Sequence, residues 1–285
     1  MKTILVTGAT GFIGNYVVEE LLCKDYRVIA TSAHTKNAIN KIWFDKVIYK
    51  PFDLSSFDQT VNYFEYFSKP DLMIHLAWSG LPNYKDEFHV TKNLPAQIRF
   101  LKNILDNGLK NIAVTGTCLE YGMKDGCLSE EMECEPMNAY AIAKNELRKY
   151  LVHYASEKKI SLKWIRLFYL FGKGQSPNSL FSQLENGILK GQQVFNMSGG
   201  EQLRDYLPVE LAAKYICTIA LQDKVSGIIN CCSGEPVKII DLVEKFVKES
   251  GSEIKLNKGF YPYPDYEPMA FWGNNSKLKK VIHNE

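Results

Sequence analysis

Tyr140 and Lys144 stand four positions apart, near the start of a run with helical spacing at residues 138–158. Residues at positions i and i+4 share one face of a helix, so the phenol and the ammonium group are expected to lie side by side. An ammonium group beside a phenol favours the phenolate and lowers the pKa of the phenol from about 10 toward neutrality. Such a phenol can donate or accept a proton near pH 7. The same pattern is common where a tyrosine packs in a core and a lysine is solvated, so the pair needs a second signal.

Thr117 supplies the second signal, because it follows a predicted strand at residues 112–115. The carboxyl ends of parallel strands border the ligand crevice of an α/β sheet. The hydroxyl, the phenol and the ammonium group together predict a site for acid–base chemistry at this edge of a sheet.

Gly8, Gly11 and Gly14 form the pattern Gly-x-x-Gly-x-x-Gly within TGATGFIG, between a predicted strand at residues 3–7 and a predicted helix at 12–23. Gly8 allows a tight turn, Gly11 lets the backbone approach a pyrophosphate, and Gly14 lets the helix pack against the strand. The amino end of the helix offers free N–H groups and the positive end of its dipole. This context predicts a dinucleotide-binding turn and disfavours a purely structural one.

The end of the second predicted strand, residues 26–30, bears on the choice of cofactor. An acidic residue there would bind the ribose 2′-hydroxyl of NAD, but the segment ATSAHTK contains none. Ser32 and Lys36 suit a 2′-phosphate, which favours NADP(H) over NAD(H); a solvated loop without a role is the other interpretation. Asp53 follows the third strand, where it can accept a hydrogen bond from the adenine amino group or cap the next helix.

Strands alternate with helices along most of the chain. The predicted strands are residues 3–7, 26–30, 47–49, 72–76, 112–115, 162–167 and 227–231. The predicted helices are residues 12–23, 57–67, 87–107, 138–158, 179–190, 209–222 and 239–249. Near-continuous apolar strands between long helices indicate βαβ units and a buried parallel sheet. The fold class is therefore predicted as α/β, a Rossmann-type doubly wound parallel sheet.

The alternation stops after Leu170 and returns at about 208–234. Two domains are therefore predicted. Residues 1–170 plus about 208–234 would form a dinucleotide-binding Rossmann domain, and about 171–207 plus 235–285 a smaller C-terminal substrate-binding lobe.

The 285 residues carry 34 lysines and arginines against 32 aspartates and glutamates, a net charge of +2. This balance supplies no basic field for a nucleic-acid backbone. No apolar run approaches the roughly 18 to 20 residues that span a bilayer, and the N-terminus lacks a signal-peptide pattern. Seven cysteines without a CxxC pair indicate free thiols in a reducing cytosol and no metal site. A cytoplasmic protein without nucleic-acid or membrane partners is expected.

These motifs, in this order, resemble the extended short-chain dehydrogenase/reductases, the NAD-dependent epimerase/dehydratase family. The resemblance rests on TGATGFIG, the Asp53 turn, His75-Leu76-Ala77, Thr117 four residues before Tyr121-Gly122, the Tyr140/Lys144 pair and Arg204-Asp205-Tyr206. It implies Thr117, Tyr140 and Lys144 as the catalytic residues. It also implies that Asn93 is a buried helix residue supporting the site, and that Arg204 binds the substrate diphosphate.

Cofactor contacts are expected at Gly8, Thr10, Gly11, Phe12, Ile13, Ser32, Lys36, Asp53, Leu54, Leu76, Ala77, Tyr140 and Lys144. Substrate contacts are expected at Trp78, Thr117, Asn178 and Arg204. In the 4,6-dehydratases of the family, Asp-Glu directly follows the catalytic threonine, whereas Cys118 and Leu119 stand there in this chain. Neither can protonate or deprotonate a sugar, so a dehydratase is disfavoured.

The segments GTCLEYG, EQLRDYLPVE and YPYPDYEPMAFWG look most like the reductases of 4-keto-6-deoxy sugar nucleotides, such as dTDP-4-dehydro-6-deoxyglucose reductase and CDP-abequose synthase. The resemblance thus implies an NADPH-dependent reductase that makes a deoxysugar nucleotide for surface polysaccharide. It also implies a homodimer built from the helices at 87–107 and 138–158. Two alternatives stay open: a C4 epimerase with permanently bound NAD, and a non-catalytic NADP-binding sensor with a protein partner.

Overall fold

The computed structural model describes residues 1–265 and 267–283. Its centre is a seven-stranded sheet in the order β12-β7-β5-β4-β1-β2-β3, with every neighbouring pair parallel. The strands are β1 (Thr3–Thr7), β2 (Arg27–Thr31), β3 (Ile48–Tyr49), β4 (Leu72–His75), β5 (Asn111–Thr117), β7 (Ser161–Leu167) and β12 (Gly227–Cys231). The predicted fold class is confirmed. The order reverses between β1 and β4, and open α/β sheets bind ligands at such a point.

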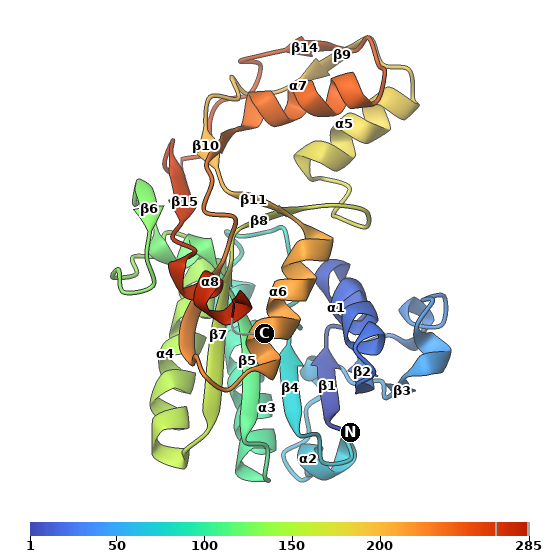
Figure 1. Ribbon diagram of the computed structural model, residues 1–285, viewed down its shortest axis with the longest axis vertical. Helices are drawn as coiled ribbons and strands as arrows, with labels where there is room; N and C mark the ends of the chain where they lie inside the picture. The colour runs from blue at the N-terminus through green and yellow to red at the C-terminus, as the bar shows by residue number, and fades with distance from the viewer. Residues whose placement is uncertain (266, 284–285) are drawn as a thin grey trace.

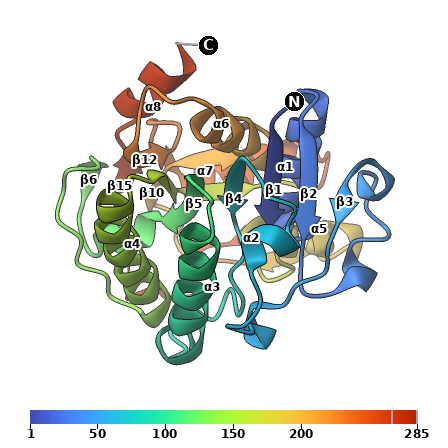
Figure 2. The same ribbon diagram turned by 90° about the horizontal axis from the view of Figure 1, so that it is seen from below.

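Helices cover both faces of this sheet (Figure 2). One face carries α1 (Phe12–Cys23), α6 (Val209–Leu221) and α8 (Ser276–Ile282); the other carries α2 (Tyr63–Tyr66), α3 (Leu94–Asp106) and α4 (Ala139–Lys158). Side chains alternate along each strand, so Ile4 and Val6 pack under α1 and α6 while Leu5 packs under α3 and α4. Within the described residues, no helix combines the length and apolar composition needed to cross a membrane.

A smaller body lies beyond one end of the sheet, at the top of Figure 1. It contains α5 (Leu180–Leu189), α7 (Ile239–Glu249) and the paired strands β9 (Val194–Asn196) and β14 (Lys255–Asn257). Three short pairs link the two bodies: β8 (Tyr169–Phe171) with β11 (Tyr206–Pro208), β10 (Leu203–Arg204) with β13 (Val237–Lys238), and β6 (Gly126–Leu128) with β15 (Phe271–Gly273). These short strands escaped prediction, because two or three residues carry too little periodicity to be read.

Two helix predictions differ from the structure, one in extent and one in the type of its first turns. The helix predicted at 57–67 is reduced to the single turn α2, because the side chains of Asp58 and Asn62 accept hydrogen bonds from the backbone N–H of Thr60 and Glu65 and so form turns of their own. The helix predicted at 87–107 begins instead as a π-helical segment, His89–Asn93, and continues as α3. Pro95, near the start of α3, lacks the N–H that a regular α-helix would use there.

The two-domain division stays a proposal, with one change. β12 and α6 return to the sheet, as the division at about 208–234 expects. Helix α8 lies within the stretch assigned to the lobe, yet its Leu278 and Val281 are buried in the core under α6. Residues 266, 284 and 285 of that stretch lie outside the described residues.

Candidate active site

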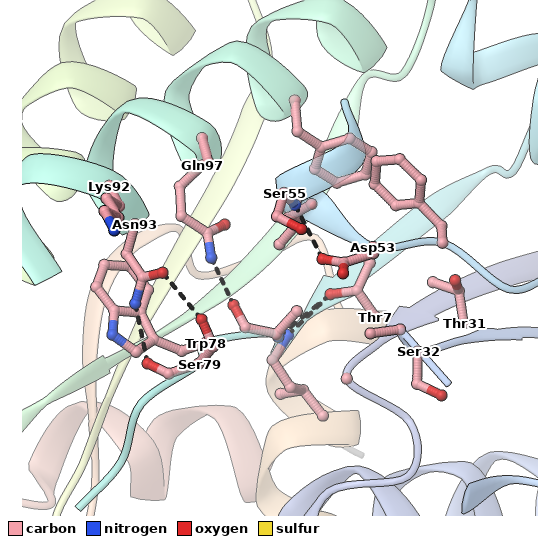
Figure 3. Close-up of a pocket in the computed structure, with 18 of the residues that line it drawn as sticks. Thr7, Thr31, Ser32, Asp53, Ser55, Trp78, Ser79, Lys92, Asn93 and Gln97 are labelled. Atoms are coloured by element: carbon pink, nitrogen blue, oxygen red, sulfur yellow. Dashed lines mark hydrogen bonds between the residues drawn. The ribbon is translucent and has the colours of Figure 1, made fainter. Parts of the chain in front are cut away.

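A cavity of about 640 Å³ lies at the carboxyl ends of β1, β2 and β4 (Figure 3). Nine of the residues expected to contact a cofactor or substrate line it: Gly8, Thr10, Gly11, Ser32, Asp53, Leu54, Leu76, Ala77 and Trp78. Phe12 and Ile13, the first residues of α1, pack their side chains against the core instead. Lys36 is exposed on the short 3-10 helix η1 (Thr35–Asn37) and does not line the cavity.

The glycine turn is built for close backbone approach. Gly8 has φ +69°, and a Cβ added there would lie 2.9 Å from the backbone nitrogen of Ala77. Ala77 lies two residues after the end of β4. A Cβ at Gly14 would lie only 2.1 Å from the Gly8 carbonyl oxygen. No Cβ fits at such distances, so these two glycines allow α1 to begin directly above the turn. The amino end of α1 therefore faces the cavity, as a pyrophosphate site requires.

The ribose end of the cavity contains hydroxyls and no carboxylate from β2. Thr31, the last residue of β2, is 1% exposed, and its hydroxyl has no hydrogen-bond partner. Ser32 Oγ lies 2.9 Å from the Tyr49 hydroxyl. Thr31 was missed from the sequence; its place at the end of the second strand was the available signal. A buried hydroxyl without a partner fits a bound ribose or phosphate oxygen, which would satisfy it.

Asp53 supplies the one carboxylate among the described residues that line the cavity. Its Oδ1 accepts a hydrogen bond from Ser55 N at 2.9 Å and so caps the 3-10 helix η3 (Leu54–Ser56). The capping interpretation is thus seen, and it leaves Oδ2 for an adenine amino group.

Two cations that sequence reasoning missed, Lys92 and Arg99, also line the cavity. Their spacing of seven places them on one face of the helix, which was the signal that could have found them.

At the chemical end, Thr117, Tyr140 and Lys144 come together from β5 and α4. The side chain of Asn138 accepts from Ala141 N at 2.9 Å and starts α4. The side chain of Thr117 lies close enough to the Tyr140 phenol to lower its pKa. Lys144 is 2% exposed, and its Nζ donates to the Thr115 carbonyl at 2.8 Å. The predicted grouping of the three residues is therefore present in the fold.

Glu120 fixes the position of Thr117 and is fully buried. Its Oε1 accepts from the backbone N–H of Thr117 at 2.9 Å, while the Thr117 hydroxyl accepts from Leu119 N, a capping box on the 3-10 helix η5 (Cys118–Tyr121). Oε2 accepts from Arg166 Nε at 2.8 Å, and Trp164 Nε1 donates to Oε1 at 3.0 Å. The negative charge of the carboxylate is thus balanced by Arg166, and both of its oxygens accept hydrogen bonds, so its burial is tolerated.

The expectation that Lys144 lowers the pKa of Tyr140 is wrong for this structure. Burial raises the pKa of the Tyr140 phenol well above its ordinary value, Tyr84 and Glu120 add to the rise, and the Thr117 side chain opposes it. Burial also lowers the pKa of Lys144 to about 7, against an upward pull from Glu120. Desolvation disfavours both charged forms and is the largest cause of both shifts. Near pH 7 the phenol therefore carries its proton.

Trp78 joins the two ends of the site. It lines the cavity, its ring centroid lies 5.8 Å from that of Tyr140, and Lys144 Nζ lies 4.2 Å from its centroid. Asn93 is 8% exposed and exchanges two hydrogen bonds of 2.9 Å with Ser79, one with its hydroxyl and one with its carbonyl. The burial expected for Asn93 is therefore present, and it holds the segment that carries Trp78.

The two remaining substrate candidates lie apart from the cavity. Asn178 is exposed in the turn before α5, where its carbonyl accepts from Gln183 Nε2 at 2.7 Å. Arg204 is 1% exposed; its guanidinium donates to the Leu203 and Met269 carbonyls and, at 3.1 Å, to Glu267 Oε2. The arginine expected to bind a diphosphate is therefore already paired with a carboxylate 63 positions along the chain.

Comparisons with known proteins place the chain in a family. Residues 4–232 match the NAD dependent epimerase/dehydratase family. The dTDP-6-deoxy-L-talose 4-dehydrogenase (NAD(+)) of Aggregatibacter actinomycetemcomitans is 33% identical over 271 residues, 95% of this chain and 98% of the relative. The dTDP-4-dehydro-6-deoxyglucose reductase of Escherichia coli is 26% identical over 90% of this chain and 82% of the relative. The UDP-glucuronic acid 4-epimerase of Bacillus cereus, in complex with UDP-glucuronic acid and NAD, shares the fold with a TM-score of 0.86 at 23% identity, over 99% of this chain and 93% of that chain.

Proposed function

The chain belongs to the NAD dependent epimerase/dehydratase family, and on that premise we propose that it is an NADPH-dependent reductase of a nucleotide-linked 4-keto-6-deoxy hexose. Family and relatives make it a sugar-nucleotide-modifying enzyme of the short-chain dehydrogenase/reductase type. The observation that carries the proposal is the buried Tyr140 phenol, which holds its proton beside Thr117, with Cys118 and Leu119 following in place of acids. The product would be a deoxysugar nucleotide for surface polysaccharide.

The names of two relatives support position 4 of a 6-deoxy sugar as the reacting centre. One is named a 4-dehydrogenase of dTDP-6-deoxy-L-talose, the other a reductase of dTDP-4-dehydro-6-deoxyglucose. Both names describe the exchange between a hydroxyl and a carbonyl at that position, in opposite directions. We therefore take dTDP as the nucleotide of the substrate.

A bound NADPH would supply the hydride that reduces the C4 carbonyl. Tyr140 then donates its proton to the oxygen at C4, and general acid catalysis of this kind contributes roughly a hundred- to ten-thousand-fold. The Thr117 hydroxyl, fixed by its cap, hydrogen-bonds the same oxygen. Lys144 holds the nicotinamide ribose with its ammonium group, and the backbone around Gly8 and Gly11 binds the pyrophosphate.

The preference for NADP(H) belongs to the proposal. It is supported by the absence of a carboxylate at the end of β2 and by Lys92 and Arg99, which line the cavity and form no ion pair within the described residues. The place of Lys36 outside the cavity lining and the NAD(+) in the name of the Aggregatibacter relative favour NAD(H). A titration with both cofactors decides between them.

Substrate contacts at Trp78, Asn178 and Arg204 are proposals as well. A diphosphate at Arg204 would have to replace the Glu267 carboxylate as its partner. We also propose a homodimer formed through α3 and α4, which lie on one face of the sheet and expose Ile142 and Val152. A monomer in light scattering at micromolar concentration would contradict it.

The function is tested by incubating the protein with NADPH and a panel of keto sugar nucleotides, beginning with dTDP-4-dehydro-6-deoxy hexoses. We expect oxidation of NADPH, seen by absorbance, and a new C4 hydroxyl in the NMR spectrum of the product. The Tyr140→Phe variant is the matched control. Stoichiometric NAD in the purified protein with no NADPH consumption would favour the C4 epimerase. Cofactor binding without turnover on any sugar would favour the non-catalytic sensor.

A further inference from the structure

We propose that Trp78 is a positioning residue for Lys144: its indole ring, fixed by the buried His89, is the platform on which the lysine ammonium group lies. We infer this on the premise that Lys144 acts as proposed above. The residues come from three separate places in the chain, the end of β4, the π-helical segment His89–Asn93 and the first turns of α4.

Among the described residues, the Lys144 ammonium group has two direct partners, the Thr115 carbonyl and the face of the Trp78 ring. Lys144 Nζ lies 4.2 Å from the ring centroid and donates a single hydrogen bond, to the Thr115 carbonyl at 2.8 Å. It forms no salt bridge with any described residue. An ammonium group over the face of an indole is attracted by the ring quadrupole, most strongly where water is excluded. Lys144 is 2% exposed, so this is a desolvated cation–π contact, the stronger kind.

His89 determines where the Trp78 ring lies. Trp78 Nε1 donates to His89 Nδ1 at 3.1 Å, and His89 Nε2 lies 3.0 Å from the Asn83 carbonyl oxygen. An indole N–H can only donate and a carbonyl can only accept. The two bonds therefore assign His89 the neutral tautomer with its proton on Nε2. Since His89 is fully buried, this histidine is a fixed anchor for the indole.

The same segment fastens the neighbouring backbone. Asn93, one π-helical turn after His89, bonds to the hydroxyl and the carbonyl of Ser79, the residue after Trp78. Its amide also lies 3.4 Å from His89 Nδ1. π-helical turns are rare and are frequently found at functional sites. Here the wide turn brings two polar side chains onto the Trp78–Ser79 segment.

The charges around Lys144 indicate what the platform does. Glu120 approaches from η5 and favours the ammonium form, while His75 of β4, whose pKa burial lowers to about 3, is neutral. Tyr140 on the same helix keeps its proton, and Arg166 of β7 is paired with Glu120. Burial alone would drive Lys144 toward its neutral form. The Trp78 ring therefore helps Lys144 to stay charged as well as in place.

The test compares Trp78→Phe, which keeps an aromatic face but cannot bond His89, with Trp78→Leu, which removes both features. The pKa of Lys144 is followed by NMR of protein labelled at the lysine Cε carbons, its signal assigned with Lys144→Arg. We expect a wild-type pKa near 7 and a fall of about one unit in Trp78→Leu, since desolvated cation–π contacts are roughly that strong. Trp78→Phe should give a smaller fall.

The matched control is Trp272→Leu, the same change in a part-buried tryptophan of β15. It should leave the Lys144 pKa unchanged. Thermal unfolding of each variant reports whether it is folded, and Trp78→Phe carries the test if Trp78→Leu is not. The platform is overturned if the pKa of Lys144 is the same in wild type and in the folded Trp78 variants, or falls equally in Trp272→Leu. A lowered pKa with unchanged turnover would support the platform and contradict the proposed role of Lys144.

Discussion

The nucleotide end and the chemical end of the site are constructed in different ways. The nucleotide end is an open cavity of about 640 Å³ whose turn depends on backbone geometry, with Gly8 and Gly14 in positions that admit no Cβ. The chemical end consists of the buried side chains of Tyr140, Lys144 and Glu120, which other elements hold by hydrogen bonds or by ring contacts. One end positions N–H groups and the other positions titratable groups.

Because the two ends are built differently, substitutions at each end are expected to change different properties. A change of side chain at the chemical end should alter the turnover rate and its pH dependence, while the glycine turn still binds the cofactor. An added methyl group in the glycine turn alters cofactor binding and stability while the titratable groups keep their partners. If substitutions at either end changed turnover and cofactor binding together, the two ends would work as one unit.

The largest effect is expected for Tyr140→Phe. The ring packs against Trp78, Tyr84 and His89, and those contacts survive loss of the hydroxyl. The proton donor is lost, so turnover should fall by roughly a hundred- to ten-thousand-fold, while the affinity for NADPH hardly changes. Steady-state kinetics and cofactor fluorescence measure the two quantities.

Near-normal turnover in Tyr140→Phe would mean that the proton comes from another group. Loss of cofactor affinity in step with turnover would instead make Tyr140 a binding residue and remove the contrast between the two ends. Lys144→Ala provides the comparison, since it should damage both turnover and cofactor binding.

Gly14→Ala should act at the opposite end. The new Cβ would lie 2.1 Å from the Gly8 carbonyl oxygen, so α1 must shift away from the turn. Overpacking of this kind costs about 1–3 kcal/mol, and we expect a lower melting temperature and about a tenfold loss of NADPH affinity. Differential scanning calorimetry and fluorescence titration test both expectations.

Gly251→Ala is the control for this change. Gly251 has φ +67° but open space around its Cα, so alanine there costs backbone strain alone and should leave cofactor affinity intact. Equal cofactor affinities in Gly14→Ala and wild type would contradict the close-approach argument.

Local patterns let the sequence predict much of this molecule. The first strand, turn and helix, and the Tyr140/Lys144 spacing, depend on neighbours within a few residues, so periodicity and glycine positions suffice. The direction of the Tyr140 pKa shift could not be predicted, because desolvation depends on what the tertiary fold packs around the phenol. The Trp78–Lys144 contact and the Arg204–Glu267 pair join residues more than 60 positions apart, which no local pattern reveals.

The pH profile should report the chemical end. Lys144 is charged below its pKa of about 7 and neutral above it, whereas Tyr140 stays protonated well beyond that range. If the ammonium group is needed to hold the cofactor, kcat/KM for NADPH should be level below pH 7 and fall by about tenfold per pH unit above it. Lys144→Arg should lack this limb, because arginine stays charged. A wild-type profile that rises through pH 7 would assign the ionisation to another group.

The smallest effect is expected for Lys36, and it tests which cation at the nucleotide end binds a 2′-phosphate. Lys36 is exposed and does not line the cavity, so any contact with a 2′-phosphate is a solvated one, worth about 0.2–1 kcal/mol. Lys36→Ala should therefore weaken NADPH binding by at most about fivefold and leave NADH binding unchanged.

Lys46→Ala is the matched control, since Lys46 is likewise exposed on a 3-10 helix, η2 (Phe44–Lys46), and does not line the cavity. Fluorescence titrations of both cofactors on the three proteins measure the ratio of the two dissociation constants. A wild-type preference for NADH would end the proposal of NADP(H), and a preference for NADPH that survives Lys36→Ala would place the phosphate contact elsewhere, with Lys92 and Arg99 the next cations to replace.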